Sequence, residues 1–233
     1  MENQKIGFIG LGLIGGSLAK TIRRKHPEIT IIATDIDVKA LSDAKEEGTI
    51  NDAYPTFGPA FYDVSYLFLC APIRANLEVV SDIKDHLPQE SDCIITDVGS
   101  MKRNIHEEIR FLGMDNRFIG GHPMAGKQYG GFKNSSGSLF DGATMVLVTE
   151  RRDDIHFLAG LKELFAMAGF GKLSFMTAEQ HDDMIAFTSQ LTHIAANAFV
   201  KNDDYHVKKA FVLSNTREIT TNGKITYLPI YDV

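Results

Sequence analysis

Three glycines near the start of the chain, Gly10, Gly12 and Gly15, form a G-x-G-x-x-G pattern between a predicted strand and a predicted helix. The first glycine of such a turn permits a tight bend, the second lets a pyrophosphate approach the backbone, and the third lets the helix pack close to the strand. The N–H groups at the start of the helix face the phosphates. The pattern therefore predicts dinucleotide binding, with cofactor contacts from Gly10, Gly12, Leu13, Ile14 and Gly15.

An acidic residue, Asp35, ends the second predicted strand, 20 residues after Gly15 (35 − 15). A carboxylate at this place accepts hydrogen bonds from the adenine ribose and repels a 2′-phosphate. Asp37 lies two residues further on and competes for the ribose role. Ser17 adds a hydroxyl within reach of the phosphates. These features favour NAD over NADP as the cofactor.

Three further segments follow predicted strands, and open α/β sheets place their sites where the carboxyl ends of strands meet. The segments are Cys70 to Pro72, Asp97 to Lys102, and Gly120 to Gly126. Further cofactor contacts are expected from Ala71, Pro72 and Ser100.

Two side chains in these segments, His122 and Ser100, are candidates for catalysis. An imidazole titrates near neutral pH and is suited to take a proton. The alternative for His122 is a surface loop histidine, or one bonded to a neighbouring carbonyl. Ser100 by itself is typical of a helix N-cap, because Asp-x-Gly-Ser precedes a predicted helix, and a serine at such a cap can also serve a site.

Short apolar runs alternate with amphipathic stretches of helical length, which is typical of βαβ units and a parallel sheet. The predicted strands are 5–9, 30–34, 64–70, 93–97, 117–120, 144–148 and 172–175. The predicted helices are 13–25, 38–47, 76–85, 101–112, 154–168 and 178–200. We therefore expect a Rossmann-type α/β domain over residues 1–176.

The end of the chain has a different pattern. The predicted helix 178–200 carries an apolar stripe that must be buried, and we expect it to pair with its counterpart in a homodimer. Residues 219–221 and 224–227 are rich in β-branched side chains and flank Asn222-Gly223, which is typical of a two-residue hairpin. We expect residues 177–233 to form a partial, truncated helical dimerisation and substrate domain with a hairpin-like tail.

The composition excludes several classes of protein. The chain has 233 residues, with 24 Lys and Arg against 30 Asp and Glu and a net charge of −6, which argues against nucleic acid or an anionic membrane surface as a partner. Two cysteines, Cys70 and Cys93, give neither a disulfide framework nor zinc-ligand spacing, so no metal is expected. With no signal-peptide cleavage site and no apolar run of about 20 residues, we expect a soluble, cytoplasmic protein.

Together, these segments resemble the prephenate/arogenate dehydrogenase family. The matching pieces are Gly10 to Ser17, Asp97 to Lys102, Gly120 to Gly126, and His181-Asp182 with Ser189 and His193 on one predicted helix. The resemblance implies NAD-dependent oxidative decarboxylation of prephenate to 4-hydroxyphenylpyruvate in tyrosine biosynthesis. Arogenate is the alternative substrate.

The resemblance also implies roles for individual side chains. His122 accepts the proton of the ring hydroxyl and Ser100 orients it, while His181 and Asp182 make gate or hinge contacts. The residues assigned to the substrate are His193, Ser189, Lys127 and Arg217.

Two positions depart from the family pattern. Lys127 and Gln128 follow Gly126, where the family commonly carries a hydroxyl residue and an acid. Lys127 is a candidate for contact with a substrate carboxylate, with an exposed loop lysine as the alternative. Arg217 is the candidate for the substrate-binding arginine of the family's C-terminal helical domain.

Two other functions stay open. A catalytically defective NAD-binding relic or regulatory protein is favoured by the short C-terminal region and opposed by Ser100, His122 and His193. A β-hydroxyacid-type dehydrogenase usually relies on a lysine in the first long helix after the Rossmann domain, and residues 178–200 contain none.

Overall fold

The computed structural model describes residues 4–88, 91–149, 155–191, 194, 218–221 and 224–227. The chain divides into two compact units, Met1–His181 and Asp182–Val233. None of the helices in the described part of the chain is long and apolar enough to cross a bilayer.

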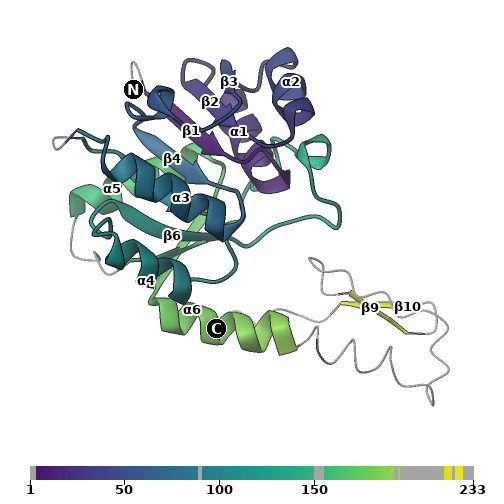
Figure 1. The fold of residues 1–233 in the computed structure, drawn as a ribbon. Helices are drawn as coiled ribbons and strands as arrows, with labels where there is room; N and C mark the ends of the chain where they lie inside the picture. Colours follow the sequence, from purple (N-terminus) through teal and green to yellow (C-terminus); the bar gives the residue numbers. More distant parts are fainter. Residues whose placement is uncertain are drawn as a thin grey trace. The chain divides into compact units, whose positions relative to one another are not determined.

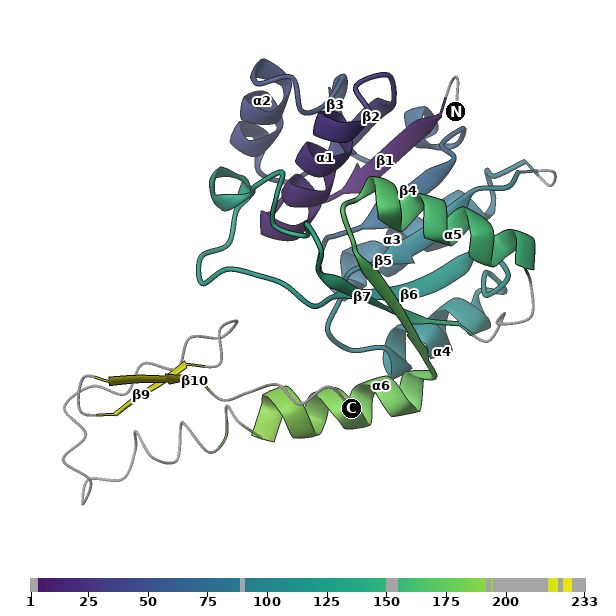
Figure 2. The same cartoon turned by 180° about the vertical axis from the view of Figure 1, so that it is seen from behind.

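Within its described residues, the first unit is built on one eight-stranded sheet in the order β3-β2-β1-β4-β5-β6-β7-β8 (Figures 1 and 2). Strands β1 to β6 are parallel wherever they pair. The strands are β1 (Lys5–Ile9), β2 (Thr30–Thr34), β3 (Asp52–Tyr54), β4 (Tyr66–Leu69), β5 (Ile94–Asp97), β6 (Phe118–Pro123), β7 (Thr144–Val148) and β8 (Lys172–Met176). This is the Rossmann-type α/β architecture expected from the sequence.

One pair of strands departs from the parallel arrangement that the βαβ pattern indicates. β7 runs antiparallel to β6, and β8 then runs parallel to β7. A parallel neighbour needs a crossover, usually a helix, on one face of the sheet. The chain between β6 and β7 forms only a loop with the short 3₁₀ turn η2 (Phe132–Asn134), so the strand returns in the opposite direction.

Helices cover both faces of the sheet. α1, α2 and α5 pack on one face, and α3 and α4 lie side by side on the other (Figures 1 and 2). Their bounds are α1 (Leu13–Lys25), α2 (Val38–Glu46), α3 (Ile73–Lys84), α4 (Arg103–Phe111) and α5 (Ile155–Met167), with α6 (Ala178–Ile185) following β8 and the turn η1 (Pro59–Phe61) preceding β4.

Each face of the sheet has its own apolar core. On the α1 side, the rings of Phe8 and Phe68 stack with centroids 4.9 Å apart, and Phe165 of α5 meets Phe68 edge-on. On the other side, Phe61 and Ile105 belong to a second cluster of buried residues. Fully burying one such side chain stabilises a fold by about 1.5–3 kcal/mol, so these layers hold the strand ends in fixed relative positions.

Two helix starts differ from the predicted ones. α3 begins at Ile73, directly after Pro72, because a proline before or within the first turn removes no helical hydrogen bond. α4 begins at Arg103 with Lys102 at the N-cap position and no capping side chain, so the prediction of Ser100 as an N-cap is wrong. Ser100 is instead exposed in the loop between β5 and α4.

The second unit begins inside α6. The α-helix gives way to a π-helical segment, Ala186–Gln190, so the helix predicted for residues 178–200 is not α-helical throughout. Strands β9 (Glu218–Thr221) and β10 (Lys224–Tyr227) are antiparallel, and Thr221 pairs with Lys224. The pairing agrees with the strands predicted for residues 219–221 and 224–227, while Asn222 and Gly223 of the predicted turn and the predicted helix beyond residue 194 lie outside the described residues.

Candidate active site

The turn between β1 and α1 has the geometry that its glycines predict. Gly10 has φ +95°, and a Cβ there would lie 2.9 Å from the backbone nitrogen of Ala71. A Cβ at Gly15 would overlap the carbonyl oxygen of Gly10. At Gly12, by contrast, a Cβ would meet nothing within 4 Å. The space beside Gly12 is therefore where a pyrophosphate can approach the backbone, and the turn fits a dinucleotide.

In the described part of the chain, the first turn of α1 has neither a capping side chain nor an acidic residue of its own. Gly12 is the N-cap of this helix. Leu13 and Ile14 are half-buried at this helix start. Their N–H groups belong to the first turn, which has no intrahelical acceptors and attracts anions.

Asp35 lies beside this turn at the end of β2. Its Oδ2 accepts a hydrogen bond of 2.5 Å from Leu11 N–H, and its Oδ1 accepts one of 2.7 Å from Asp37 N–H. The Asp37 carboxylate caps α2, where Oδ1 accepts from the N–H groups of Lys39 and Ala40. Of the two acids, Asp35 is the one held against the glycine turn.

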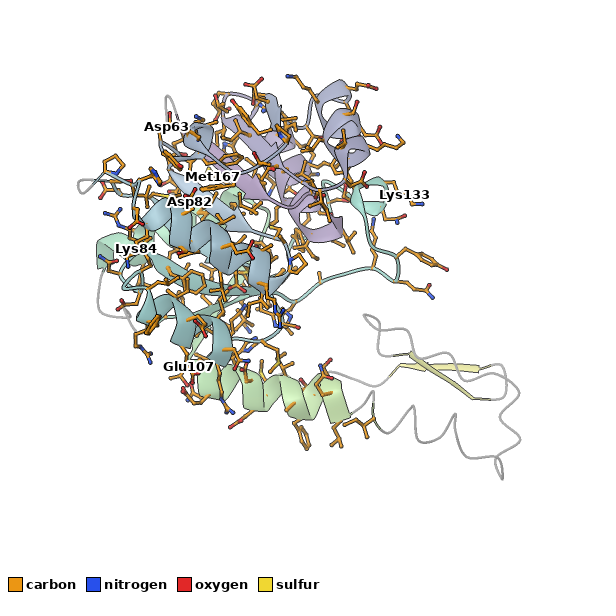
Figure 3. All side chains as sticks on the ribbon, viewed as in Figure 1. Asp63, Asp82, Lys84, Glu107, Lys133 and Met167 are labelled. Atoms are coloured by element: carbon orange, nitrogen blue, oxygen red, sulfur yellow. The ribbon has the colours of Figure 1, made fainter. Side chains whose placement is uncertain are left out.

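Ser17 has a different use from the expected one. Its side chain is fully buried, and its Oγ accepts a hydrogen bond of 3.0 Å from Ser136 N–H. Oγ1 of Thr21, one turn later, donates a hydrogen bond of 2.9 Å to the carbonyl oxygen of Gly137. These bonds attach the loop between β6 and β7 to α1. Lys133, labelled in Figure 3, marks the η2 turn of this loop.

The segment after β4 closes the other side of the glycine turn. Cys70 N–H donates a hydrogen bond of 2.7 Å to the carbonyl oxygen of Ile9, and Nδ2 of Asn76 donates one of 2.8 Å to the carbonyl oxygen of Ala71. Burial raises the pKa of the Cys70 thiol far above its usual range, and the charges of Asp97 and Asp35 add to the effect. Cys70 is therefore a protonated packing residue. The backbone of Cys70 and Ala71 faces Gly10, and Pro72 is the N-cap residue of α3.

A buried ion pair follows β5. Lys102 is fully buried, and its Nζ donates 2.6 Å to Oδ2 of Asp97 and 2.7 Å to the carbonyl oxygen of Gly99. The Asp97 carboxylate also accepts from Gly99 N–H at 2.9 Å and from Gly121 N–H at 3.0 Å. Sequence reasoning gave neither residue a role, although the Asp97 to Lys102 segment was singled out as a motif.

His122 extends beyond the end of β5. The parallel register of β5 and β6 pairs Thr96 with Ile119, and the half-buried His122 follows three residues later, opposite Val146 of β7. Ser100 follows the end of β5 and is exposed. Ser100 thus follows the carboxyl end of β5, and His122 lies near the carboxyl end of the adjacent parallel strand β6.

His122 contacts a second histidine. Its Nδ1 lies 2.9 Å from Nε2 of His181, and the ring centroids are 5.1 Å apart. His181 is fully buried. The resemblance suggested only a gate or hinge contact for His181, and no spacing in the sequence indicates this pair because its members are 59 residues apart.

The start of α6 fixes where His181 lies. Thr177 and Gln180 form a capping box, in which Gln180 N–H donates 3.2 Å to Oγ1 of Thr177 and Thr177 N–H donates 3.0 Å to Oε1 of Gln180. Arg103 of α4 donates 3.3 Å to the carbonyl oxygen of Glu179. The Thr-x-x-Gln pattern is readable in the sequence and is the signal that marks this helix start.

The residues assigned to the substrate are not brought together by the described part of the chain. Lys127 is in the loop after β6, and its Nζ donates 2.8 Å to the carbonyl oxygen of Asn134. Ser189 lies in the π-helical segment of the second unit. His193 and Arg217 lie outside the described residues.

The sheet, the glycine turn and the acid at the end of β2 define a Rossmann-type nucleotide-binding domain. A family model described as "Prephenate dehydrogenase, nucleotide-binding domain" matches residues 18–171. The chain belongs to this family.

Known relatives are similar over most of the chain. A prephenate dehydrogenase of Lactococcus lactis subsp. cremoris is 34% identical over 87% of this chain and 55% of its own length. The structure of prephenate dehydrogenase from A. aeolicus with hydroxyphenyl propionate and NAD⁺ superposes with a TM-score of 0.77 at 26% identity, over 92% of this chain and 73% of that one. The structure of Synechocystis arogenate dehydrogenase superposes with a TM-score of 0.74 at 31% identity, over 86% of this chain and 72% of that one. The chain spans little more than half the length of the Lactococcus relative.

Proposed function

We propose that the protein catalyses the NAD-dependent oxidative decarboxylation of prephenate to 4-hydroxyphenylpyruvate, a step of tyrosine biosynthesis. The observation that carries the proposal is the order of strands. β1, β4, β5 and β6 are parallel neighbours, so their carboxyl ends lie at the same edge of the sheet. This edge carries the glycine turn, Ala71-Pro72, Ser100 and His122. An open α/β sheet binds its ligands at this edge.

Each group has a defined task in the reaction. NAD, when bound, accepts the hydride from the ring carbon that bears the hydroxyl. His122 takes the hydroxyl proton, and Ser100 orients that hydroxyl. Loss of the hydride and the proton leaves a ring ketone, and release of CO₂ is then driven by aromatisation. The protein has only to position the ring carbon, take one proton and exclude water.

The remaining assignments complete the proposal. We assign His193 and Ser189 to the substrate on the strength of the family resemblance, and Arg217 as the candidate for the family's substrate-binding arginine. We assign Lys127, which departs from the family pattern, to a substrate carboxylate because of its charge. We assign residues 1–176 to the NAD-binding domain and 177–233 to a helical domain for dimerisation and substrate binding. Cytoplasmic location is supported by Cys70 and Cys93, which are both free thiols.

A homodimer is part of the proposal. Phe187, Leu191 and Ile194 of the second unit are 73%, 50% and 64% exposed. Phe187 lies in the π-helical segment, and Leu191 and Ile194 follow it after four and then three residues. An apolar stripe of this kind is normally buried against a partner helix. A second copy of the chain offers the same stripe, which suits a symmetric contact.

Arogenate is the second candidate substrate, favoured by the similarity to the Synechocystis arogenate dehydrogenase. The two substrates share the reacting ring and differ only in the keto or amino group of the side chain. The deciding experiment measures NADH production by the full chain with prephenate, arogenate and a 3-hydroxyacid in parallel.

The His122→Asn variant is the matched test of the chemistry. We expect turnover to fall by at least about 100-fold, the general scale of acid–base catalysis, while NAD affinity stays close to that of the unmodified protein. Near-normal turnover of this variant at pH 7 contradicts the role of His122. NAD binding without turnover of any of the three substrates would favour the relic or regulatory protein instead.

A further inference from the structure

Only one hydrogen atom can lie between Nδ1 of His122 and Nε2 of His181. A neutral imidazole has one N–H donor and one nitrogen lone pair, on different ring atoms. At 2.9 Å, Nδ1 of His122 and Nε2 of His181 are at hydrogen-bond distance, so one of the two nitrogens donates and the other accepts. The direction of this bond decides which nitrogen of His122 is left for chemistry.

We infer that His181 is a positioning residue for His122. Its Nε2 accepts a hydrogen bond from Nδ1–H of His122, which leaves Nε2 of His122 as the nitrogen that takes the substrate proton. The inference rests on the proposed function for the origin of that proton, but the direction of the hydrogen bond is a property of the protein alone.

The opposite direction is incompatible with a proton acceptor at this place. If His181 donated to Nδ1 of His122, the hydrogen of the neutral His122 ring would have to be on Nε2. Neither nitrogen of His122 would then have a lone pair available for the substrate. The bond from His122 to His181 also survives the reaction, because both nitrogens of an imidazolium are donors. No ring has to rotate between the two states.

Both rings are held by rigid elements. His122 is in β6, whose backbone pairs with β7 at Val146. His181 is fully buried at the start of α6, where its N–H donates 3.0 Å to the carbonyl oxygen of Thr177 and the Thr177–Gln180 capping box fixes the first turn. A catalytic group is placed most precisely by a partner on a helix or a strand.

The first test reads the tautomers directly by NMR of the full chain labelled with ¹⁵N-histidine. The ¹⁵N shift separates a protonated from an unprotonated ring nitrogen, and spectra of His122→Asn and His181→Gln assign the signals. We expect neutral His122 to carry its hydrogen on Nδ1 and His181 to accept at Nε2. A neutral His122 protonated at Nε2 would overturn the inference. This result does not depend on which substrate the enzyme turns over.

The second test compares two substitutions of His181 with a distant control. His181→Phe keeps the bulk but has no acceptor, whereas the amide oxygen of Gln in His181→Gln can still accept from Nδ1–H of His122. We expect the Phe variant to lose about 10- to 100-fold in kcat with little change in the KM for NAD, the usual effect of removing the partner that orients a histidine. The Gln variant should recover most of this loss.

The control is His86→Gln, because His86 stacks on Tyr62, away from the site, and should leave kcat unchanged. A folded His181→Phe variant with unaltered kcat would overturn the inference. If the Phe variant does not fold, the tautomer of the unmodified protein and the kcat of the Gln variant still decide it. An unmodified chain that oxidises none of the three substrates contradicts the proposed function alone, since the NMR experiment still reports the direction of the bond.

Discussion

Nζ of Lys102 lies 2.6 Å from Oδ2 of Asp97, and both side chains are almost completely shielded from solvent. The same carboxylate accepts from Gly121 N–H, one residue before His122. The ion pair therefore joins the loop that carries Ser100 to the strand that carries His122. Close packing around the pair also explains Gly120 and Gly121. A Cβ at Gly120 would lie 2.5 Å from Nε2 of His106 and 2.9 Å from Cδ of Lys102, and a Cβ at Gly121 would lie 2.5 Å from the carbonyl oxygen of Asp97.

This ion pair predicts a large loss of stability in Lys102→Met. The methionine keeps most of the bulk but leaves the Asp97 carboxylate buried without its cation, which costs about 3–5 kcal/mol. Urea unfolding measures the loss. Lys84→Met, at an exposed position labelled in Figure 3, is the control and should be nearly neutral. The double variant Asp97→Asn/Lys102→Met should recover part of the loss. If the free energy of unfolding of Lys102→Met is less than about 1 kcal/mol below that of the unmodified protein, the ion pair does not hold these two segments together.

The glycine turn predicts opposite effects for two alanine substitutions. Gly12→Ala places its methyl group in open space at φ −68°, so stability should change by no more than about 0.5 kcal/mol. The methyl group then occupies the space of the pyrophosphate, and NAD binding should weaken by at least about tenfold. Gly15→Ala forces a methyl group against Gly10 and should destabilise the fold by about 1–3 kcal/mol or more.

Unfolding curves and NAD titrations of both glycine variants separate the two roles. Unchanged NAD affinity in a stable Gly12→Ala protein would show that the dinucleotide does not approach this turn.

The position of Asp35 predicts the choice between NAD and NADP. Asp35→Asn removes the negative charge but keeps an oxygen that can accept from Leu11 N–H. Repulsion between a carboxylate and a 2′-phosphate at a few ångströms is worth on the order of 1–4 kcal/mol, so the preference for NAD should fall by at least about fivefold. The ratio of the two dissociation constants measures the change. Equal affinity of the unmodified protein for both cofactors would contradict this interpretation of Asp35.

Cys93 predicts how stability depends on alkaline pH. Burial raises the pKa of its thiol to about 12, against a smaller opposing effect of Arg117. Because the folded state holds this proton more tightly than the unfolded chain, the contribution is complete below the unfolded pKa near 8.5. It is lost as pH rises toward 12, so the free energy of unfolding should fall over this range. Cys93→Ala should flatten that part of the curve, and an identical slope in both proteins would contradict the assignment.

Much of the sheet could be predicted because its signals are local. The strands Lys5–Ile9 and Thr30–Thr34 and the helix Leu13–Lys25 are bounded by their own apolar periodicity and glycines. The direction of β7 was missed because the sequence has no local mark for it. That direction follows from the connection between β6 and β7, in which residues 124–143 form a loop with the η2 turn in place of a crossover helix.

The candidate site was predictable where one residue type carries the chemistry, as at His122, and not where two distant residues meet. The pairing of Lys102 with Asp97 depends on burial, and that of His122 with His181 depends on the position of the first turn of α6, where Arg103 contacts Glu179. No local pattern in the sequence marks either of these two contacts. The Thr177–Gln180 capping box was readable, but it marks only a helix start.

The exposed stripe of the second unit predicts a homodimer. Phe187 and Leu191 are 73% and 50% exposed, and their burial between two copies is the simplest way to remove them from water. Phe187→Lys and Leu191→Lys should each shift the protein toward monomer in sedimentation velocity, because a charge buried in such a contact is costly. Phe111→Lys is the matched control, since Phe111 is 87% exposed on the first unit and has no place in the proposed contact. A well-behaved monomer of the unmodified chain at micromolar concentration would refute the dimer. A dimer that all three variants leave intact would instead show that the stripe is not its interface.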